Sequence, residues 1–261
     1  MTFRDAILEV QGLTKTFGGL QALWQVDFEV ARHGVTALIG PNGAGKTTCL
    51  NVISGVHAPS QGRVVFDGLS VTSLKPHQIA YRGLTRTFQN IQVFRHMTVL
   101  ENVMVGLHVR TSRGFISSML HTPGVRGEEK FITEKALAIL DFFGLADKAA
   151  WEASSLPYGE QKRVEMARAL VAGPRLLLLD EPAAGLNTRE TQDLAEVIEK
   201  IRDQGVTILL VEHDMDLVMG AADWIVVLNY GQKIAAGPPR QVQNDPEVIS
   251  AYLGSEAPDL A

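Results

Sequence analysis

The residues best suited to chemistry are a lysine and a threonine at the end of a glycine-rich segment. The segment Gly40-Pro41-Asn42-Gly43-Ala44-Gly45-Lys46-Thr47 fits the pattern G-x-x-x-x-G-K-[ST], in which backbone N–H groups surround phosphate groups. Residues 34–39 before it predict a buried strand and residues 46–53 after it predict a helix, which is the context that the pattern requires. The helix N-terminus adds a partial positive charge beside the anion. We expect Lys46 to bind the β- and γ-phosphates and the Thr47 hydroxyl to bind Mg²⁺.

Two acidic residues end a second strand that is rich in apolar residues. Residues 175–180 contain four consecutive leucines and predict a central parallel strand. Ligands bind at the carboxyl ends of strands in such sheets, so Asp180 is a candidate Mg²⁺ ligand and Glu181 a candidate base for an attacking water. His213 follows a third apolar run, 206–211, and a histidine there could contact a γ-phosphate. A single histidine is more often structural, so His213 is a candidate only because of the neighbouring motifs.

Composition limits the class of protein. The chain has 261 residues, 46% of them hydrophobic, which is enough for one large domain with a sizeable core. Its net charge of −5 argues against a dedicated nucleic-acid binder, and its one cysteine, Cys49, excludes an internal disulfide framework and suits a reducing compartment. No stretch approaches the ~18 apolar residues that span a bilayer, and residues 1–10 lack the apolar core of a signal peptide. We therefore expect a cytoplasmic protein, for which any membrane role would have to come through a partner.

The elements that must position these residues alternate between strands and helices. Apolar and period-two patterns predict strands at 6–10, 24–30, 34–39, 62–68, 85–89, 175–180, 206–211, 224–228 and 233–235. Caps and apolar spacing predict helices at 46–53, 99–107, 131–143, 156–171, 188–202 and 246–252. No strand is predicted between 98 and 172, which indicates a parallel α/β core interrupted by a helical region. Residues 108–130 have no clear period and predict a loop or short-helix insertion with a solvated basic face.

The ordered set of motifs resembles the ATPase subunit of ABC transporters from about residue 8 to residue 253. The motifs are Phe17, Gly40–Thr47, Gln89, Leu156–Gln161, Asp180-Glu181, Ala184–Asn187 and His213. A phosphate-binding loop alone occurs in many nucleotide hydrolases, whereas the full set in this order is specific. The resemblance implies an α/β fold, with a P-loop NTPase core and mostly parallel sheet, an N-terminal antiparallel β part and an inserted helical subdomain. It implies a single ABC ATPase domain at 1–254, with the core at 1–97 and 173–240, the helical subdomain at 98–172 and a disordered tail at 255–261.

The resemblance also assigns roles to the motif residues. It implies that Phe17 stacks on adenine, although from the residues alone a core position at a strand end is an equal alternative. It implies that Gln89 senses Mg²⁺ or water and couples to a membrane subunit, and that Asp180 binds Mg²⁺. Glu181 is implied as the catalytic base and His213 as the histidine that contacts the γ-phosphate. The other implied ATP contacts are Gly40 to Thr47 with Thr48, and Tyr158, Gly159 and Glu160 of the signature segment.

Two departures from the family pattern concern the signature and the loop that follows the acidic pair. Pro157-Tyr158 replaces the serine and first glycine of Leu-Ser-Gly-Gly-Gln, and Asn187 replaces an aspartate. The serine contact to phosphate is therefore absent, while Gly159 and the helix N-terminus remain. Both departures, together with runs such as Ala251–Gly254, resemble the Liv-type ATPases of branched-chain amino-acid importers.

The resemblance implies an ATPase subunit that binds ATP and Mg²⁺ and works at the cytoplasmic face of the inner (plasma) membrane. Its implied partners are a second ABC ATPase subunit, identical or related, two transmembrane permease subunits and, indirectly, a periplasmic or extracellular substrate-binding protein; no nucleic acid is expected. Branched-chain or other hydrophobic amino acids are the expected cargo, with a urea or amide importer or a lipid exporter as alternatives. A non-transport ABC ATPase fits less well because the chain lacks coiled-coil, zinc or tandem insertions. A GTPase would need an Asn-Lys-x-Asp motif, which the chain lacks.

Overall fold

The core of the molecule is a six-stranded sheet in the order β10-β9-β3-β8-β7-β6. The computed structural model describes residues 5–87, 92–109 and 123–253. Neighbouring strands pair in parallel except β10, which is antiparallel to β9. Strands β3, β7 and β8 are buried along their whole length, as their continuous apolar runs predict. The strands are β3 (Val35–Ile39), β6 (Leu84–Arg86), β7 (Leu176–Asp180), β8 (Thr207–Val211), β9 (Trp224–Asn229) and β10 (Gln232–Gly237).

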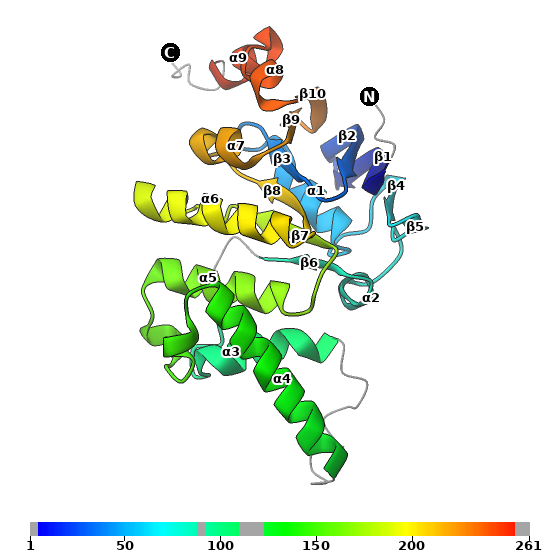
Figure 1. Cartoon of the computed structure of the whole chain (residues 1–261). Helices are drawn as coiled ribbons and strands as arrows, with labels where there is room; N and C mark the ends of the chain where they lie inside the picture. The colour runs from blue at the N-terminus through cyan, green and yellow to red at the C-terminus, as the bar shows by residue number, and fades with distance from the viewer. Residues whose placement is uncertain (1–4, 88–91, 110–122, 254–261) are drawn as a thin grey trace.

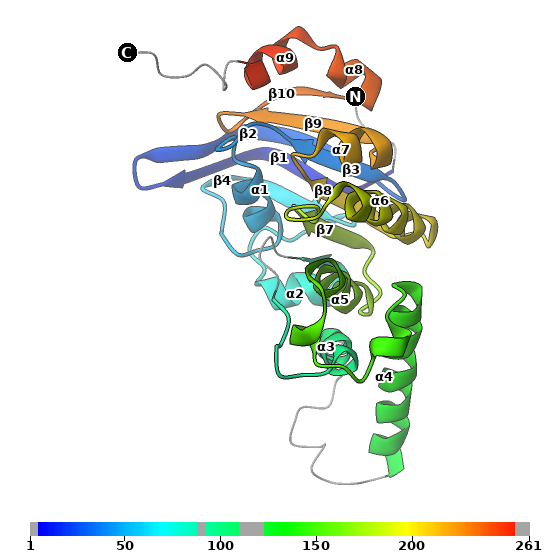
Figure 2. The same ribbon diagram turned by 90° about the vertical axis from the view of Figure 1, so that its left-hand side faces the viewer.

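A second, antiparallel sheet has the order β2-β1-β4-β5. One apolar cluster joins side chains of both sheets and of α1 (Lys46–Ile53). Figure 2 shows the long β1–β2 hairpin extending beside α1. Both hairpin strands are longer than the segments predicted at 6–10 and 24–30, because register shifts in β1 interrupt the period-two pattern. The strands are β1 (Ala6–Phe17), β2 (Leu20–Ala31), β4 (Gln61–Phe66) and β5 (Leu69–Ser70).

The described part of the chain between β6 and β7 forms helices and no strand. Helices α3 (Val99–Val105), α4 (Pro123–Phe142) and α5 (Tyr158–Leu170) lie together below the six-stranded sheet (Figure 1). The predicted capping box starts α3, since the Glu101 N–H donates to Thr98 Oγ1 at 3.1 Å. Helix α4 begins at Pro123, within the segment 108–130 that was predicted as a loop or short-helix insertion; the long helix was predicted only from residue 131, because glycines in its first turns lower its helix propensity. Short 3₁₀ turns lie at Gly106–Val109, Ala146–Lys148 and Ala153–Ser155.

The other helices complete an α/β architecture of the kind that the sequence predicted. Helix α6 (Thr188–Asp203) shares one apolar cluster with α3, α4 and α5, and α7 (Met215–Ala221) and α9 (Pro246–Leu253) belong to the cluster around β9. The sequence did not predict α2 (Pro76–Tyr81), α7 or α8 (Pro239–Gln243), because helices of six, seven and five residues are too short to show a helical period. The tail predicted at 255–261 lies outside the described residues.

Candidate nucleotide-binding site

Parallel pairing brings the carboxyl ends of three strands to one edge of the sheet. Strand β3 leads into Gly40, β7 ends at Asp180, and β8 leads into Glu212. Leu38 of β3 pairs with Val211 of β8, and Val211 in turn lies opposite Asp180. Motifs that are far apart in the sequence therefore meet at the edge where ligands bind in sheets of this type.

The loop from Gly40 to Gly45 has a backbone shape that suits phosphate binding. Gly40, Gly43 and Gly45 have φ angles of 149°, 80° and 99°, which residues with side chains rarely adopt. A Cβ atom on Gly40 would lie 2.0 Å from the carbonyl oxygen of Leu228, and one on Gly45 would lie 2.7 Å from that of Ala22. Helix α1 starts directly after Gly45 without a side-chain cap, so its first N–H groups suit an anion.

The Lys46 side chain folds back over its own loop. Its Nζ donates hydrogen bonds to the carbonyl oxygens of Gly40 at 2.6 Å and Pro41 at 3.0 Å. Burial lowers the pKa of Lys46, and nearby carboxylates, that of Glu181 foremost, oppose the shift. The loop therefore holds a positive charge at the position where the sequence pattern places β- and γ-phosphates.

The phosphate-binding loop lines a pocket of about 480 Å³. The wall also includes Phe17 and residues 20–22 of the β1–β2 hairpin, Glu181, and the turn Tyr230-Gly231, in addition to residues 42–48 of the loop. Three predicted groups, namely Phe17, the loop and Glu181, thus share one pocket. Sequence reasoning missed residues 20–22 and the Tyr230-Gly231 turn; the available signal was a tyrosine-glycine pair between two predicted strands.

Phe17 lies at the end of β1 and is 41% exposed, so it is not a core residue. The His57 ring meets it edge-on at 5.2 Å between centroids, and Lys15 Nζ lies 4.8 Å from its centroid. These contacts hold the ring at the wall of the pocket, where an aromatic face can stack on a base.

Asp180 is buried in an ion pair that the sequence did not reveal. Arg86 Nη2 donates to Asp180 Oδ2 at 2.7 Å, and the two side chains are 6% and 3% exposed. Arg86 also donates to Asn51 Oδ1 of α1 at 2.7 Å, so it ties α1 to the end of β7. Within the described ranges, Asp180 Oδ1 has no hydrogen-bond partner. A buried carboxylate oxygen in this state fits Mg²⁺, which binds through one or two carboxylates together with phosphate oxygens and water.

Glu181 has a left-handed backbone with φ of 46°, which is uncommon for a residue other than glycine. Its N–H donates to the carbonyl oxygen of Val211 at 2.8 Å, and its side chain is 18% exposed. His213 Nδ1 lies 3.9 Å from Glu181 Oε2, and the His213 side chain is 59% exposed. The structure therefore brings these two predicted residues together at an accessible position.

Glu212 organises the loops around this pair, although the sequence did not single it out. Its side chain is fully buried, and it accepts hydrogen bonds from the backbone N–H groups of Ala183 at 2.6 Å, His213 at 2.9 Å and Asp214 at 3.3 Å. The loop after Glu181 is thereby fixed relative to His213. An acidic residue directly after an apolar strand was the signal that could have identified it.

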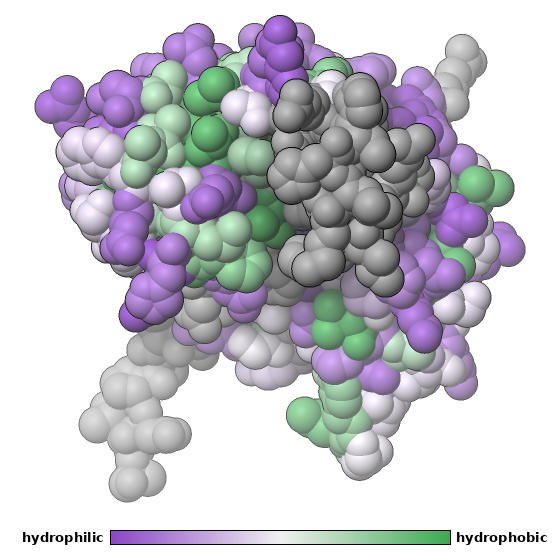
Figure 3. Space-filling model, turned by 90° about the horizontal axis from the view of Figure 1, so that it is seen from below, coloured by the Kyte–Doolittle hydropathy of each residue, from purple (hydrophilic) through white to green (hydrophobic). Residues whose placement is uncertain are grey.

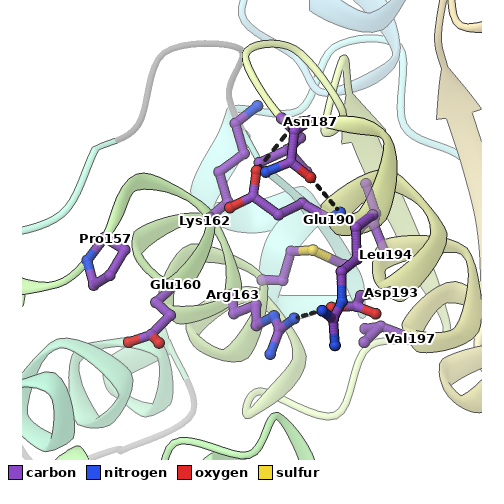
Figure 4. Close-up of a pocket in the computed structure, with 13 residues that line it drawn as sticks. Pro157, Glu160, Lys162, Arg163, Asn187, Glu190, Asp193, Leu194 and Val197 are labelled. Atoms are coloured by element: carbon purple, nitrogen blue, oxygen red, sulfur yellow. Dashed lines mark hydrogen bonds and ion pairs between the residues drawn. The ribbon is translucent and has the colours of Figure 1, made fainter.

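The signature segment lies apart from the phosphate-loop pocket. Gly159 and Glu160 line, with residues of α6, a separate pocket of about 390 Å³ (Figure 4). A Cβ atom on Gly159 would lie 3.0 Å from Glu190 Oε1. Glu160 pairs with Lys148 at 2.6 Å. In the part of the chain that the structure describes, no residue of 156–161 lines the phosphate-loop pocket of the same chain.

Two further residues that the sequence singled out, Tyr158 and Asn187, lie at the starts of α5 and α6. Tyr158 is 48% exposed at the start of α5, and its ring is so close to Gly185 that a Cβ atom there would lie 3.0 Å from Tyr158 Cε1. Asn187 caps α6, since the Glu190 N–H donates to its Oδ1 at 3.0 Å, so the departure from aspartate keeps the cap. Gln89 lies outside the described residues.

Residues 23–184 match the family model described as ABC transporter. This match spans more than half of the chain and includes the phosphate loop, the signature segment and the pair Asp180-Glu181. The chain belongs to the ABC transporter ATP-binding family. As an ABC ATP-binding protein, it is a nucleotide-binding component that works with the membrane components of a transporter. Among its described residues, no helix has the length and apolar character needed to cross a membrane.

Relatives of this ABC ATP-binding protein span almost its whole length. The high-affinity branched-chain amino acid transport ATP-binding protein BraF of Pseudomonas aeruginosa is 46% identical over 249 residues, which cover 95% of this chain and 98% of BraF. The protein LivG of Escherichia coli, which carries the same description, is 45% identical with the same coverage. Residues 232–258 match a second family model, described as branched-chain amino acid ATP-binding cassette transporter.

Solved ABC cassettes confirm the predicted fold class. An ATP-binding cassette of an ABC transporter in its ADP conformation has a TM-score of 0.84 and 35% identity, covering 95% of this chain and 99% of that one. A bacterial ABC transporter cassette described as dimeric has a TM-score of 0.75 and 25% identity, covering 89% and 99%.

Phe17→Ala is expected to weaken ATP binding by about 1–3 kcal/mol, the usual contribution of base–aromatic stacking. Phe17→Trp keeps an aromatic face and is expected to bind ATP with nearly the original affinity. Phe131→Ala is a matched control, because Phe131 is 62% exposed on α4, in the helical region. Equilibrium titration with a fluorescent ATP analogue measures all three; equal losses in Phe17→Trp and Phe17→Ala would contradict the stacking role.

Proposed function

We propose that the chain is the ATP-hydrolysing subunit of an ABC importer for branched-chain or other hydrophobic amino acids. The observation that carries this proposal is the match of residues 232–258 to the family model of branched-chain amino acid cassettes. Relatives named for branched-chain amino acid transport, which cover 95% of the chain, support the same cargo. We also propose that residues 1–254 form one cassette domain, with its core at 1–97 and 173–240 and a helical subdomain at 98–172.

In the proposed reaction, water attacks the γ-phosphorus of ATP, and ADP and phosphate are released. The N–H groups of the loop and the Lys46 ammonium hold the phosphate oxygens, and Glu181 accepts the proton that the attacking water loses. Thr47 and Asp180 are the residues that would hold Mg²⁺, which neutralises charge on the phosphates when bound. His213 lies beside Glu181 and is proposed to hydrogen-bond the γ-phosphate.

We propose that the signature segment binds the ATP held by a second cassette. Its separation from the phosphate-loop pocket of the same chain supports this arrangement. Helix α5 begins after Pro157 without a side-chain cap, so its first N–H groups suit a phosphate supplied by another subunit. A solved cassette with 25% identity is described as dimeric. The second cassette is either an identical chain or a related ATPase.

We propose that the helical region contacts two permease subunits at the cytoplasmic face of the membrane. Figure 3 shows apolar side chains gathered among hydrophilic ones on the face seen from below. Exposed apolar residues between β6 and β7 include Phe94, Phe131 and Trp151. Exposed apolar side chains that gather into a patch mark protein contacts, which supports a permease surface on this face. Gln89, which precedes this region, is proposed to link the permease contact to the site, and a periplasmic or extracellular binding protein would deliver the amino acid.

The proposal is tested by reconstituting the chain in lipid vesicles together with permease subunits, a partner ATPase and a substrate-binding protein from the same organism. ATP hydrolysis is expected to rise severalfold when the binding protein is loaded with leucine, isoleucine or valine, and labelled leucine should accumulate in step with phosphate release. Stimulation by urea or a short amide but not by leucine would contradict the cargo. Lipid export without uptake would contradict the importer assignment.

A further inference from the structure

Lys162 lies on α5, one turn after the signature glycine, yet its side chain is turned away from solvent. The residue is 7% exposed. Its Nζ donates a hydrogen bond to the backbone carbonyl oxygen of Glu181 at 3.1 Å. In Figure 4 the Lys162 side chain runs from α5 toward the loop that carries Asn187. A signature-helix side chain therefore holds the main chain of the residue that we propose as the base.

The backbone of Glu181 is strained and needs such restraints. A φ of 46° places a side-chain-bearing residue in the left-handed region, where it persists only when the surrounding structure holds it. The Glu181 N–H donates to the Val211 carbonyl oxygen of β8 at 2.8 Å, and the Glu181 carbonyl oxygen accepts hydrogen bonds from Lys162 Nζ of α5 at 3.1 Å and from the Ala184 N–H at 3.2 Å. Strand β8 and helix α5 thus hydrogen-bond the two peptide groups that flank the Glu181 side chain.

Carboxylates and an aromatic ring surround the Lys162 ammonium and hold it beside the Glu181 carbonyl oxygen. Burial lowers the pKa of Lys162, and the carboxylates of Glu212, Glu165 and Glu181 oppose the shift. Its Nζ also lies 5.6 Å from the centroid of the Tyr158 ring, where a cation and an aromatic face attract each other. The ammonium is therefore held by groups from the signature helix and from the ends of β7 and β8.

We propose that Lys162 is a positioning residue that sets the orientation of Glu181 for proton transfer. This inference rests on the proposed role of Glu181 as the general base. Because Lys162 lies on the helix whose first residues are proposed to bind a partner's ATP, displacement of that helix would move the Glu181 peptide of the same chain. Nucleotide bound at the signature of one subunit would then change the orientation of Glu181 in the phosphate-loop pocket of that same subunit. Small misplacement of a reacting group is costly, on the order of 10²-fold per ångström.

The test compares Lys162→Met, which keeps side-chain length and loses the charge, with Lys162→Arg, which keeps a donor. In the full chain, Lys162→Met is expected to lower kcat by on the order of 10- to 100-fold while leaving the ATP dissociation constant and thermal midpoint close to those of the unaltered protein. Lys162→Arg is expected to recover most of the turnover. Lys200→Met is the matched control, because Lys200 is 60% exposed on α6 and pairs with Glu196 of the same helix.

Unchanged turnover in Lys162→Met would overturn the inference. Parallel loss of turnover, ATP affinity and thermal stability, without recovery in Lys162→Arg, would also overturn it, because that pattern marks a general structural role. Glu181→Gln measured in the same series separates this inference from the proposed function. Turnover lost in Glu181→Gln but kept in Lys162→Met rejects the positioning role alone, whereas turnover kept in Glu181→Gln rejects the base itself.

Discussion

Glu181→Gln is expected to lose ATP turnover by on the order of 10²-fold or more while it keeps its affinity for ATP. Glutamine has nearly the same shape as glutamate, so the left-handed backbone and its hydrogen bond to Val211 are expected to persist. An amide cannot accept the proton that an attacking water must lose, whereas the contacts of Lys46 and the loop to phosphate are unaffected. Steady-state phosphate release and equilibrium nucleotide binding, measured on the same preparation, check both halves of this expectation.

A suitable control for that experiment is Glu196→Gln. Glu196 is a 70% exposed glutamate on α6 that pairs with Lys200. The same chemical change there is expected to leave turnover within about twofold, because single surface ion pairs contribute little. Normal turnover in Glu181→Gln would exclude this carboxylate as the base and would direct attention to His213.

Gly159→Asp is expected to abolish ATP-dependent pairing of cassettes while the isolated subunit binds ATP almost normally. An aspartate at the start of α5 adds bulk and a negative charge where a partner's phosphate is proposed to lie. The phosphate-loop pocket of the same chain is lined by other residues in the described structure, so its affinity should be spared. ATP titration of the monomer, beside ATP-dependent dimerisation in a Glu181→Gln background, measures the two effects separately.

The Glu190 carboxylate lies beside Gly159, so the controls for Gly159→Asp must separate its effect from that of a partner's phosphate. A Cβ atom at Gly159 would lie 3.0 Å from Glu190 Oε1, the flexible end of a side chain, so Gly159→Ala should be accommodated by a small shift. Adding Glu190→Gln to Gly159→Asp removes the repulsion between two carboxylates within the chain. Dimerisation restored by that addition would mean that the aspartate acted through α6, and weaker ATP binding by a folded monomer would mean that the signature acts within its own subunit.

The sequence predicted the parts of the site that are contiguous in the chain. The loop from Gly40 to Thr47 and the pair Asp180-Glu181 each follow a continuous apolar strand, and parallel strands bring their carboxyl ends together by geometry alone. The helices that the structure describes between β6 and β7 were also predictable, because helical spacing and capping are local properties of the sequence. Solved cassettes confirm the resulting fold class.

Residues that act through tertiary contacts could not be predicted in the same way. Arg86 meets Asp180 across 94 positions of sequence, and Lys162 meets the Glu181 carbonyl across 19. The sequence around Arg86 or Lys162 does not distinguish either residue from a surface cation. Their burial follows from contacts that form only in the folded chain. The left-handed conformation of Glu181 was likewise hidden, because it depends on the hydrogen bonds that its peptide groups find in the folded chain.

The position of β3 in the sheet has a consequence for how the protein is made on the ribosome. The strand that leads into the phosphate loop pairs with β8 and β9, both of which are synthesised much later. Just before β3, for example, the His33 N–H bonds to Thr207 Oγ1, 174 positions further along the chain. At about 5–20 residues per second, the nascent β3 waits roughly 9–35 s for its first partner, with both edges unpaired. A chaperone that shields this apolar segment during that interval would therefore be expected to raise the yield of folded cassette.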